Sequence, residues 1–195
     1  MLRRAATILL LAVLVAGCSG SSASPKLKSG DLAKLVLQPS DLSKVFDRFD
    51  EGRQIRADFH PGPRAKPDRF GRQDGWKARY KRAGGATTPG PLVIESRADV
   101  FGDSGGAKKD LDAYAEEFSG TGGARPVDAP KLGDGSRAFE IGQGTATSGV
   151  TYYLIAWRDG RFTASLNVSG FTGRVTFADA LALARKQEAH LAAAR

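Results

Sequence analysis

The chain has 195 residues, of which 41% are hydrophobic and 8% are aromatic, and its formal net charge is +8 at pH 7. This length and apolar fraction suit one packed domain and exclude a wholly disordered chain. Because the sequence has one cysteine and two histidines, it excludes an internal disulfide and a cysteine-based zinc site, and we expect no metal and no other cofactor.

The first seventeen residues have the pattern of an export signal. Arg3 and Arg4 form a basic start, and an apolar run over 5–15 follows, which only Thr7 interrupts. This run is shorter than the about 20 residues that a membrane-spanning helix needs. We therefore interpret residues 1–17 as a signal peptide that is removed from the mature chain.

The signal ends in Leu14-Val15-Ala16-Gly17-Cys18, which resembles the lipobox of bacterial lipoproteins. The resemblance implies that the Cys18 thiol receives a diacylglyceryl group and that cleavage precedes Cys18. Two or more acyl chains anchor a protein stably. We expect a chain held on the extracytoplasmic face of the cell membrane through its lipidated Cys18; the alternative is an ordinary secretory signal with an accidental cysteine.

A flexible tether precedes the folded part of the chain. Residues 18–29 are mostly small and polar, and such a segment spans roughly 18 Å root mean square. No repeat or second linker divides residues 30–195, so we expect one domain there. Without the signal the chain has 27 basic and 21 acidic residues, a net charge of +6. Because the chain is predicted to leave the cytoplasm, we do not interpret this excess as nucleic-acid binding.

Hydrophobic periodicity predicts an α+β domain. In chain order the pattern predicts a helix that follows Ser40 and includes Leu42, Val45 and Phe46, strands over 75–82 and 91–101, a helix over 107–118, strands over 137–142, 150–158 and 161–168, and a helix from Thr176 to near the C-terminus. Asp159-Gly160 is a hairpin signal, and Thr176 with Asp179 has the pattern of a capping box. The strand over 150–158 is apolar on both sides. An antiparallel sheet of about five strands with helices packed on one face fits this order.

Several segments also carry a resemblance to a known family: Leu35-Val36-Leu37, Asp41-Leu42, the strand from Trp76 to Arg82, the hairpin from Tyr152 to Phe162, and the segment 180–187. Together they resemble small actinobacterial-type lipoproteins with a PsbP-like α/β sandwich, a fold also seen in extracellular sensor domains of bacterial serine/threonine kinases. These domains share no reaction. The resemblance therefore implies a binding or interaction domain.

Catalytic signals in the sequence are weak, and we expect no enzyme. His60 precedes Pro61-Gly62-Pro63 in a predicted loop, and His190 lies five residues from the end, so both are predicted to be exposed. Glycosidases need only two carboxyl groups that folding brings together. Four carboxylates lie on one predicted helix, and we interpret them as a solvated face: Asp110, Asp112, Glu116 and Glu117.

Positive charge is concentrated in residues 44–82, which hold twelve Lys and Arg and six Asp and Glu. The candidate residues for binding an anion or a partner share the predicted outer face of the sheet: Lys77, Arg79, Lys81 and Arg97. We expect Glu95 and Asp99 beside them, with Thr163, Ser165 and Asn167 on the same face. One interpretation is a solvated face with ion pairs that each contribute less than about 1 kcal/mol. The other is an anion-binding surface that faces the membrane or the wall.

Three functional hypotheses follow. The first is a membrane-anchored, non-catalytic binding module, sensor-like in kind, whose partner is an anionic lipid, a wall polymer or an envelope protein. The second is a carrier that shelters a lipid or a small hydrophobic molecule between sheet and helices. The third is a hydrolase, which requires two acids or a histidine and an acid to meet in a cleft. We favour the first.

Overall fold

The computed structural model describes residues 28–128, 131–146 and 148–194, so Cys18 and most of the predicted tether lie outside the described residues. Its strands are β1 (Asp47–Arg53), β2 (Arg72–Lys81), β3 (Val93–Phe101), β4 (Ala124–Pro126), β5 (Gly135–Gln143), β6 (Val150–Asp159) and β7 (Phe162–Phe171). Its helices are α1 (Ser29–Ala33), α2 (Ser104–Ser119) and α3 (Phe177–Ala192), with short 3-10 helices η1 (Pro39–Asp41), η2 (Arg56–Asp58) and η3 (Pro67–Phe70). None of these helices is long and apolar enough to span a membrane.

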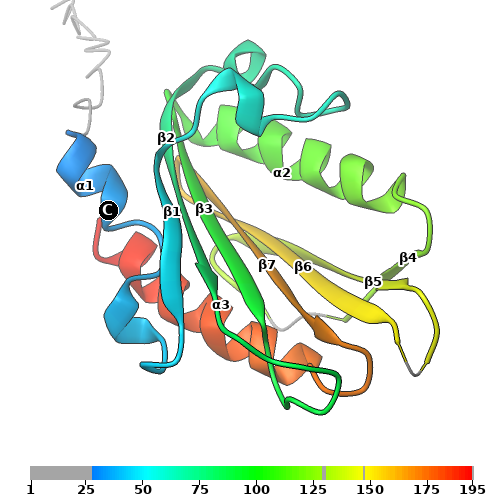
Figure 1. The fold of residues 1–195 in the computed structure, drawn as a ribbon. Helices are drawn as coiled ribbons and strands as arrows, with labels where there is room; N and C mark the ends of the chain where they lie inside the picture. The colour runs from blue at the N-terminus through cyan, green and yellow to red at the C-terminus, as the bar shows by residue number, and fades with distance from the viewer. Residues whose placement is uncertain (1–27, 129–130, 147, 195) are drawn as a thin grey trace, which may run out of the picture.

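All seven strands of the described chain form one antiparallel sheet in the order β1-β2-β3-β7-β6-β5-β4 (Figure 1). The α+β class and the antiparallel sheet are confirmed, but the predicted number of about five strands is too low. β1 was missed because it is an exposed edge strand whose residues are mostly charged, and β4 because it has only three residues.

Helices cover both faces of the sheet, which corrects the prediction that they pack on one face. Alternate residues of β7 show this: Ala164 and Leu166 join the core that contains α3, whereas Ser165 lies on the opposite face and bonds Tyr114 of α2. Figure 1 shows α2 on one side of the sheet and α3 on the other. The apolar pattern of β6 required this arrangement, because Ile155 packs toward α3 and Ala156 toward α2.

The main core lies between the sheet and α3, and it includes residues that flank α1. Its largest side chains are fully buried: Trp157, Tyr80, Leu32, Leu35, Leu37, Ile94, Leu132, Ile155, Leu166 and Leu191. The C-terminal end of α3 therefore lies next to α1, as Figure 1 shows. A smaller core joins α2 to β5 and β6 through Leu111, Tyr114, Phe118 and Phe139.

The helix predicted after Ser40 is wrong. Only the 3-10 helix η1 forms there, because Asp41 accepts a hydrogen bond from the backbone N–H of Gln38 (2.6 Å) and Leu42 leaves the helix with extended backbone angles. The other signals are confirmed: Gly160 adopts the left-handed conformation of the β6–β7 hairpin, and Thr176 caps α3 in a capping box with Asp179.

Candidate functional site

A buried network of charged side chains holds segment 54–71 between the sheet and α2. The Arg64 guanidinium binds Asp110 of α2 (Nε–Oδ1, 2.9 Å) and Asp99 of β3 (Nη2–Oδ2, 3.0 Å). Arg72 binds the other oxygen of Asp99 (2.6 Å), and Thr163 of β7 donates to Asp110 (2.7 Å). The side chains of Arg64 and Asp110 are 4% and 0% exposed, so the prediction that Asp110 belongs to a solvated face is wrong.

The charge on Arg64 is stabilised although the side chain is out of water. Burial disfavours a charged guanidinium, but the oxygens of Tyr114, Asp110 and Asp99 outweigh it and raise the pKa of Arg64 above its ordinary value. The guanidinium carbon also lies 3.5 Å from the centre of the Tyr114 ring, a cation–π contact. Arg64 is therefore charged at any pH at which the chain is folded, and it fixes the position of its segment.

Beside this network, a groove runs across the sheet beneath α2. Two adjoining cavities of about 150 and 230 Å³ form it, and both are lined by Glu117, Phe118, Leu154 and Asn167. The first cavity adds mainly polar residues: Asp58, His60, Glu95, Arg97 and Ser165. The second adds mainly apolar and uncharged ones: Thr121, Ile141, Gln143 and Tyr152. The groove therefore has a charged half and an apolar half.

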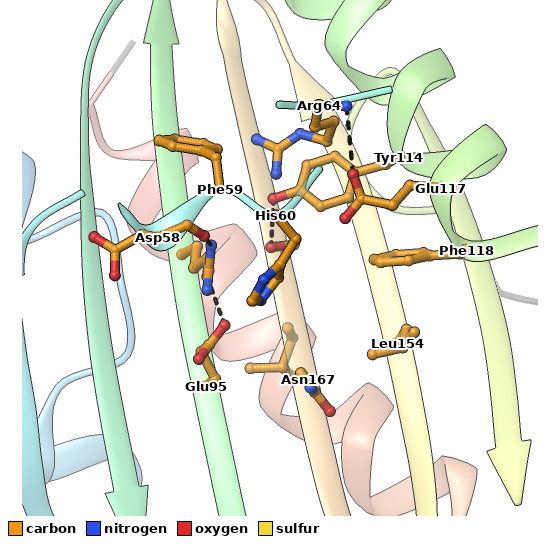
Figure 2. A pocket seen from close by; sticks show the side chains of 13 residues that line it. Asp58, Phe59, His60, Arg64, Glu95, Tyr114, Glu117, Phe118, Leu154 and Asn167 are labelled. Carbon is orange, nitrogen blue, oxygen red and sulfur yellow. Dashed lines mark hydrogen bonds and ion pairs between the residues drawn. The ribbon is translucent and has the colours of Figure 1, made fainter. Parts of the chain in front are cut away.

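His60 lines the charged half, and Figure 2 shows its imidazole pointing toward the space between Glu95 and Asn167. It is exposed, as predicted, and it makes no hydrogen bond to any described residue. The carboxylates around it are bonded elsewhere: Glu95 accepts from Arg97 Nε (2.5 Å), and Glu117 from the backbone N–H of Arg64 (3.3 Å). The other histidine, His190, binds Asp41 (2.9 Å) on the α3 side of the sheet.

An unsatisfied acceptor marks the junction of the two halves. The Oδ1 atom of Asn167 is buried and has no hydrogen-bond partner within the described part of the chain. Asn167 stands opposite Glu95 of β3 and Leu154 of β6, so it occupies the floor of the groove where both cavities meet. A buried acceptor without a donor is costly, by about 1–3 kcal/mol, unless a ligand or water supplies the donor.

The structure brings three of the four candidate cations together, but with acids among them. Lys77 binds Asp50 (3.1 Å) and Asp58, Arg79 binds Asp50 (3.2 Å) and Glu95, and Arg97 binds Glu95. This row holds three cations and three carboxylates, so the expected ion pairs form, but the Lys77 and Arg97 side chains are only 12% and 11% exposed and do not belong to a solvated face. Lys81 is exposed at the end of β2, where its Nζ lies 5.4 Å from the centre of the Phe49 ring.

The sequence did not indicate a role in the site for Arg64, and it placed Asn167 on the outer face of the sheet without a role. Arg64 lies in a Pro- and Gly-rich loop without periodicity, and its partners are 35 and 46 residues away along the chain. Tyr114 lies on the buried face of α2, and its hydroxyl shares a hydrogen bond with Ser165 of β7 (2.7 Å). Within the described ranges, no cluster of His, Cys, Asp and Glu is arranged to hold a metal ion.

Comparisons with known proteins show the fold alone. No protein-family model matches the chain, and no curated protein sequence matches it. Among solved structures, the chain is similar to the extracellular domain of PknH from Mycobacterium tuberculosis, with a TM-score of 0.59 and 11% sequence identity. The match covers 88% of this chain and 97% of that domain. The chain thus has the fold of that extracellular domain.

Proposed function

We propose that the chain is a lipid-anchored, extracytoplasmic binding module whose groove beneath α2 receives a short peptide segment of an envelope protein. The buried, unpartnered Asn167 Oδ1 carries this proposal, because it lies on the groove floor where a ligand must supply a hydrogen-bond donor. A peptide backbone N–H is such a donor, and extended peptides present one at regular intervals.

The shape and chemistry of the groove support a peptide. Its cavities of about 150 and 230 Å³ are each smaller than the about 300–1,000 Å³ of a typical drug-sized pocket, so each suits a side chain. Phe118, Ile141 and Leu154 offer apolar surface in one half. His60 and Arg97 offer donors in the other. One apolar side chain and one polar or acidic side chain, joined by a peptide backbone, match both halves.

Binding fits the site better than the two alternatives. A hydrolytic base is oriented by a bonded partner, but His60 is bonded to no acid in the described structure. A lipid carrier needs an empty apolar space between sheet and helix, whereas Trp157, Leu35 and Leu191 fill the α3 layer with 0% exposure. Anchoring at Cys18 would place the groove close to the membrane, where envelope proteins present extracytoplasmic segments.

A photo-crosslinking residue in the groove tests the proposal. We expect a probe at Gln143 of the full, lipidated chain to capture a discrete protein in native membranes, because Gln143 is exposed and lines the apolar half. The same probe at Arg185, exposed on α3 across the sheet, is the matched control and should not capture it.

The crosslink should also depend on the groove itself. Thr121→Arg fills the apolar half and Asn167→Leu removes the floor acceptor, so either variant should abolish the crosslink from position 143. Equal capture from positions 143 and 185, crosslinks to lipid only, or full retention in both variants would contradict the proposal. Far-UV circular dichroism checks that each variant is folded.

A further inference from the structure

A third cavity, separate from the two that form the groove, also has Phe59 in its lining. It encloses about 270 Å³ between η2, η3 and the start of β2, and Phe59 lines both spaces. Four cations line this cavity against one carboxylate: Arg56, Lys66, Arg69 and Arg72, with Asp68. This charged cavity was not among the sites that the sequence indicated, although it lies in the segment that carries the positive charge.

Two residues that line the cavity, Gln54 and Arg72, each have a buried polar atom without a hydrogen-bond partner among the described residues. Gln54 is 5% exposed, and its Nε2 donates to Trp76 O (3.1 Å), Ala98 O (3.1 Å) and Asp99 Oδ1 (3.0 Å). These bonds fix the orientation of the amide and leave Oε1 without a donor. The Arg72 side chain is 9% exposed; its Nε binds Asp99, and its Nη2 has no acceptor among the described residues.

The cations at the rim keep a net positive charge. Arg56 and Lys66 make no ion pair with any described residue. Arg69 donates to the backbone carbonyl of Pro63 (2.6 Å), which leaves its charge uncompensated. Arg72, by contrast, shares a network with Arg64 in which Asp99 and Asp110 balance both charges. The rim therefore has three cations against Asp68, above a buried guanidinium donor.

We propose that this cavity binds a phosphate group that carries a hydroxyl, as in inorganic phosphate or the monoester of a small polyol. Oxyanions accept charge-assisted hydrogen bonds from guanidinium groups, and Arg72 Nη2 is a buried donor of this kind. At neutral pH, phosphate retains a proton or an ester hydroxyl that can be donated to Gln54 Oε1. A single ligand would then satisfy both buried atoms, while Lys66 and Arg69 neutralise its charge.

Calorimetric titration of the full chain in neutral detergent micelles tests this site. The ligands are inorganic phosphate, glycerol 3-phosphate, the headgroup diester glycerophosphoglycerol, and sulfate. The test variant Lys66→Gln/Arg69→Gln removes two exposed cations from the rim. The control variant Lys44→Gln/Lys109→Gln removes two exposed cations that line none of the cavities described above. Unfolding temperatures of the variants show whether folding is preserved.

We expect phosphate or its monoester to bind the wild-type chain and to bind the test variant at least about tenfold more weakly, with the control within about twofold. Sulfate, which has no proton to donate to Gln54 at this pH, should bind about tenfold more weakly than phosphate. Tighter binding of the diester than of the monoester, with the same dependence on Lys66 and Arg69, would assign the phosphate to a lipid headgroup. The absence of binding, equal binding of sulfate, or equal losses in both variants would overturn the proposal.

Discussion

Arg64 shows how one side chain can position a whole site. It lies in a segment whose own regular structure is limited to two short 3-10 helices, yet its guanidinium is bonded to both Asp99 and Asp110. Removal of one partner from a buried ion network leaves an uncompensated charge. The resulting loss in the free energy of unfolding is much larger than the contribution of an exposed ion pair. Segment 54–71, which borders the charged half of the groove and the charged cavity, is therefore held by this network rather than by an apolar core of its own.

The variant Asp110→Asn tests this role. Loss of the carboxylate leaves Arg64 buried with one of its two acidic partners, so we expect the free energy of unfolding to fall by about 3–5 kcal/mol. Urea denaturation followed by circular dichroism measures it.

Asp112→Asn is the matched control, because Asp112 lies on the same helix and pairs with Lys108 across exposed surface (2.8 Å). There we expect a loss of less than about 1 kcal/mol. Equal losses in the two variants would show that the Arg64 network does not stabilise the fold.

The buried carboxyl of Asp58 predicts a specific dependence on acid. Burial alone would raise its pKa, but hydrogen bonds from Lys77 and from the Ile55 N–H, together with the charges of Lys77 and Arg97, outweigh burial and lower the pKa. A lowered pKa means that the ionised group stabilises the folded state above the unfolded pKa of about 3.9. This contribution is lost as the pH falls through the still lower folded value.

We therefore expect Asp58→Asn to reduce the free energy of unfolding at pH 6, and the difference from wild type to shrink as the pH falls below about 4. Urea denaturation at pH 6, 4 and 3 measures both effects. Asp47→Asn removes an exposed carboxylate that makes no ion pair with a described residue, so its effect should stay small at every pH. A difference for Asp58→Asn that grew on acidification would contradict the assigned pKa shift.

At the scale of elements, the sequence pattern predicted the helices and strands that bury one face against a core, and it missed the strands that do not. Alternation indicated β2, β3 and β7, helical periodicity indicated α2, and a capping box indicated α3, because these elements pack against a core and their sequences are constrained on one side. β1 borders solvent, so its charged sequence has no alternation to detect. Segment 54–71 borders both cavities but is positioned by long-range ion pairs, which no local pattern encodes. The row of Lys77, Arg79 and Arg97 was predicted from strand spacing, whereas its charge balance depends on Asp50 and Asp58 of neighbouring segments.

Close packing of α2 against η3 depends on one glycine. A Cβ at Gly106 would overlap the carbonyl oxygen of Phe70 and come within 3.3 Å of the Phe101 ring. Gly106→Ala therefore has to push α2 away from η3 and the sheet, and we expect it to lower the free energy of unfolding by about 1–3 kcal/mol. Thermal and urea unfolding measure this loss.

The neighbouring Gly105 provides the comparison. A Cβ there would meet only the side-chain oxygen of Asp103, at 3.2 Å, which can move slightly. Alanine is favoured over glycine in a helix by about 1 kcal/mol, so Gly105→Ala should be neutral or stabilising. If both substitutions had the same effect, the contact between α2 and η3 would not be tight.

The two faces of the whole molecule differ in kind. Large apolar side chains fill the face under α3, whereas the face under α2 combines a smaller apolar core with polar residues and carries the groove and the charged cavity. Residues 44–82 hold a positive excess of +6, but Lys77 and Arg79 are offset by nearby acids. Part of the uncompensated charge lies around the charged cavity, at Arg56, Lys66 and Arg69. Both proposed sites open on one face of the sheet.

The predicted lipidation makes attachment of this domain to a membrane depend on Cys18 and on the short tether that precedes α1, which begins at Ser29. Diacylation at Cys18 would be strong enough for stable anchoring, whereas loss of the thiol would remove every acyl chain. We expect Cys18→Ser to move the chain from the detergent-rich to the aqueous phase in a Triton X-114 partition. Its unfolding temperature should not change, since the described fold begins eleven residues later.

Cys18→Ser should also abolish the crosslink from position 143, because a tether of roughly 18 Å keeps the groove beside membrane-bound partners. Ser21→Ala, within the tether, is the control and should behave like the wild type; retention of Cys18→Ser in the detergent-rich phase would show that the chain is held on the membrane in another way.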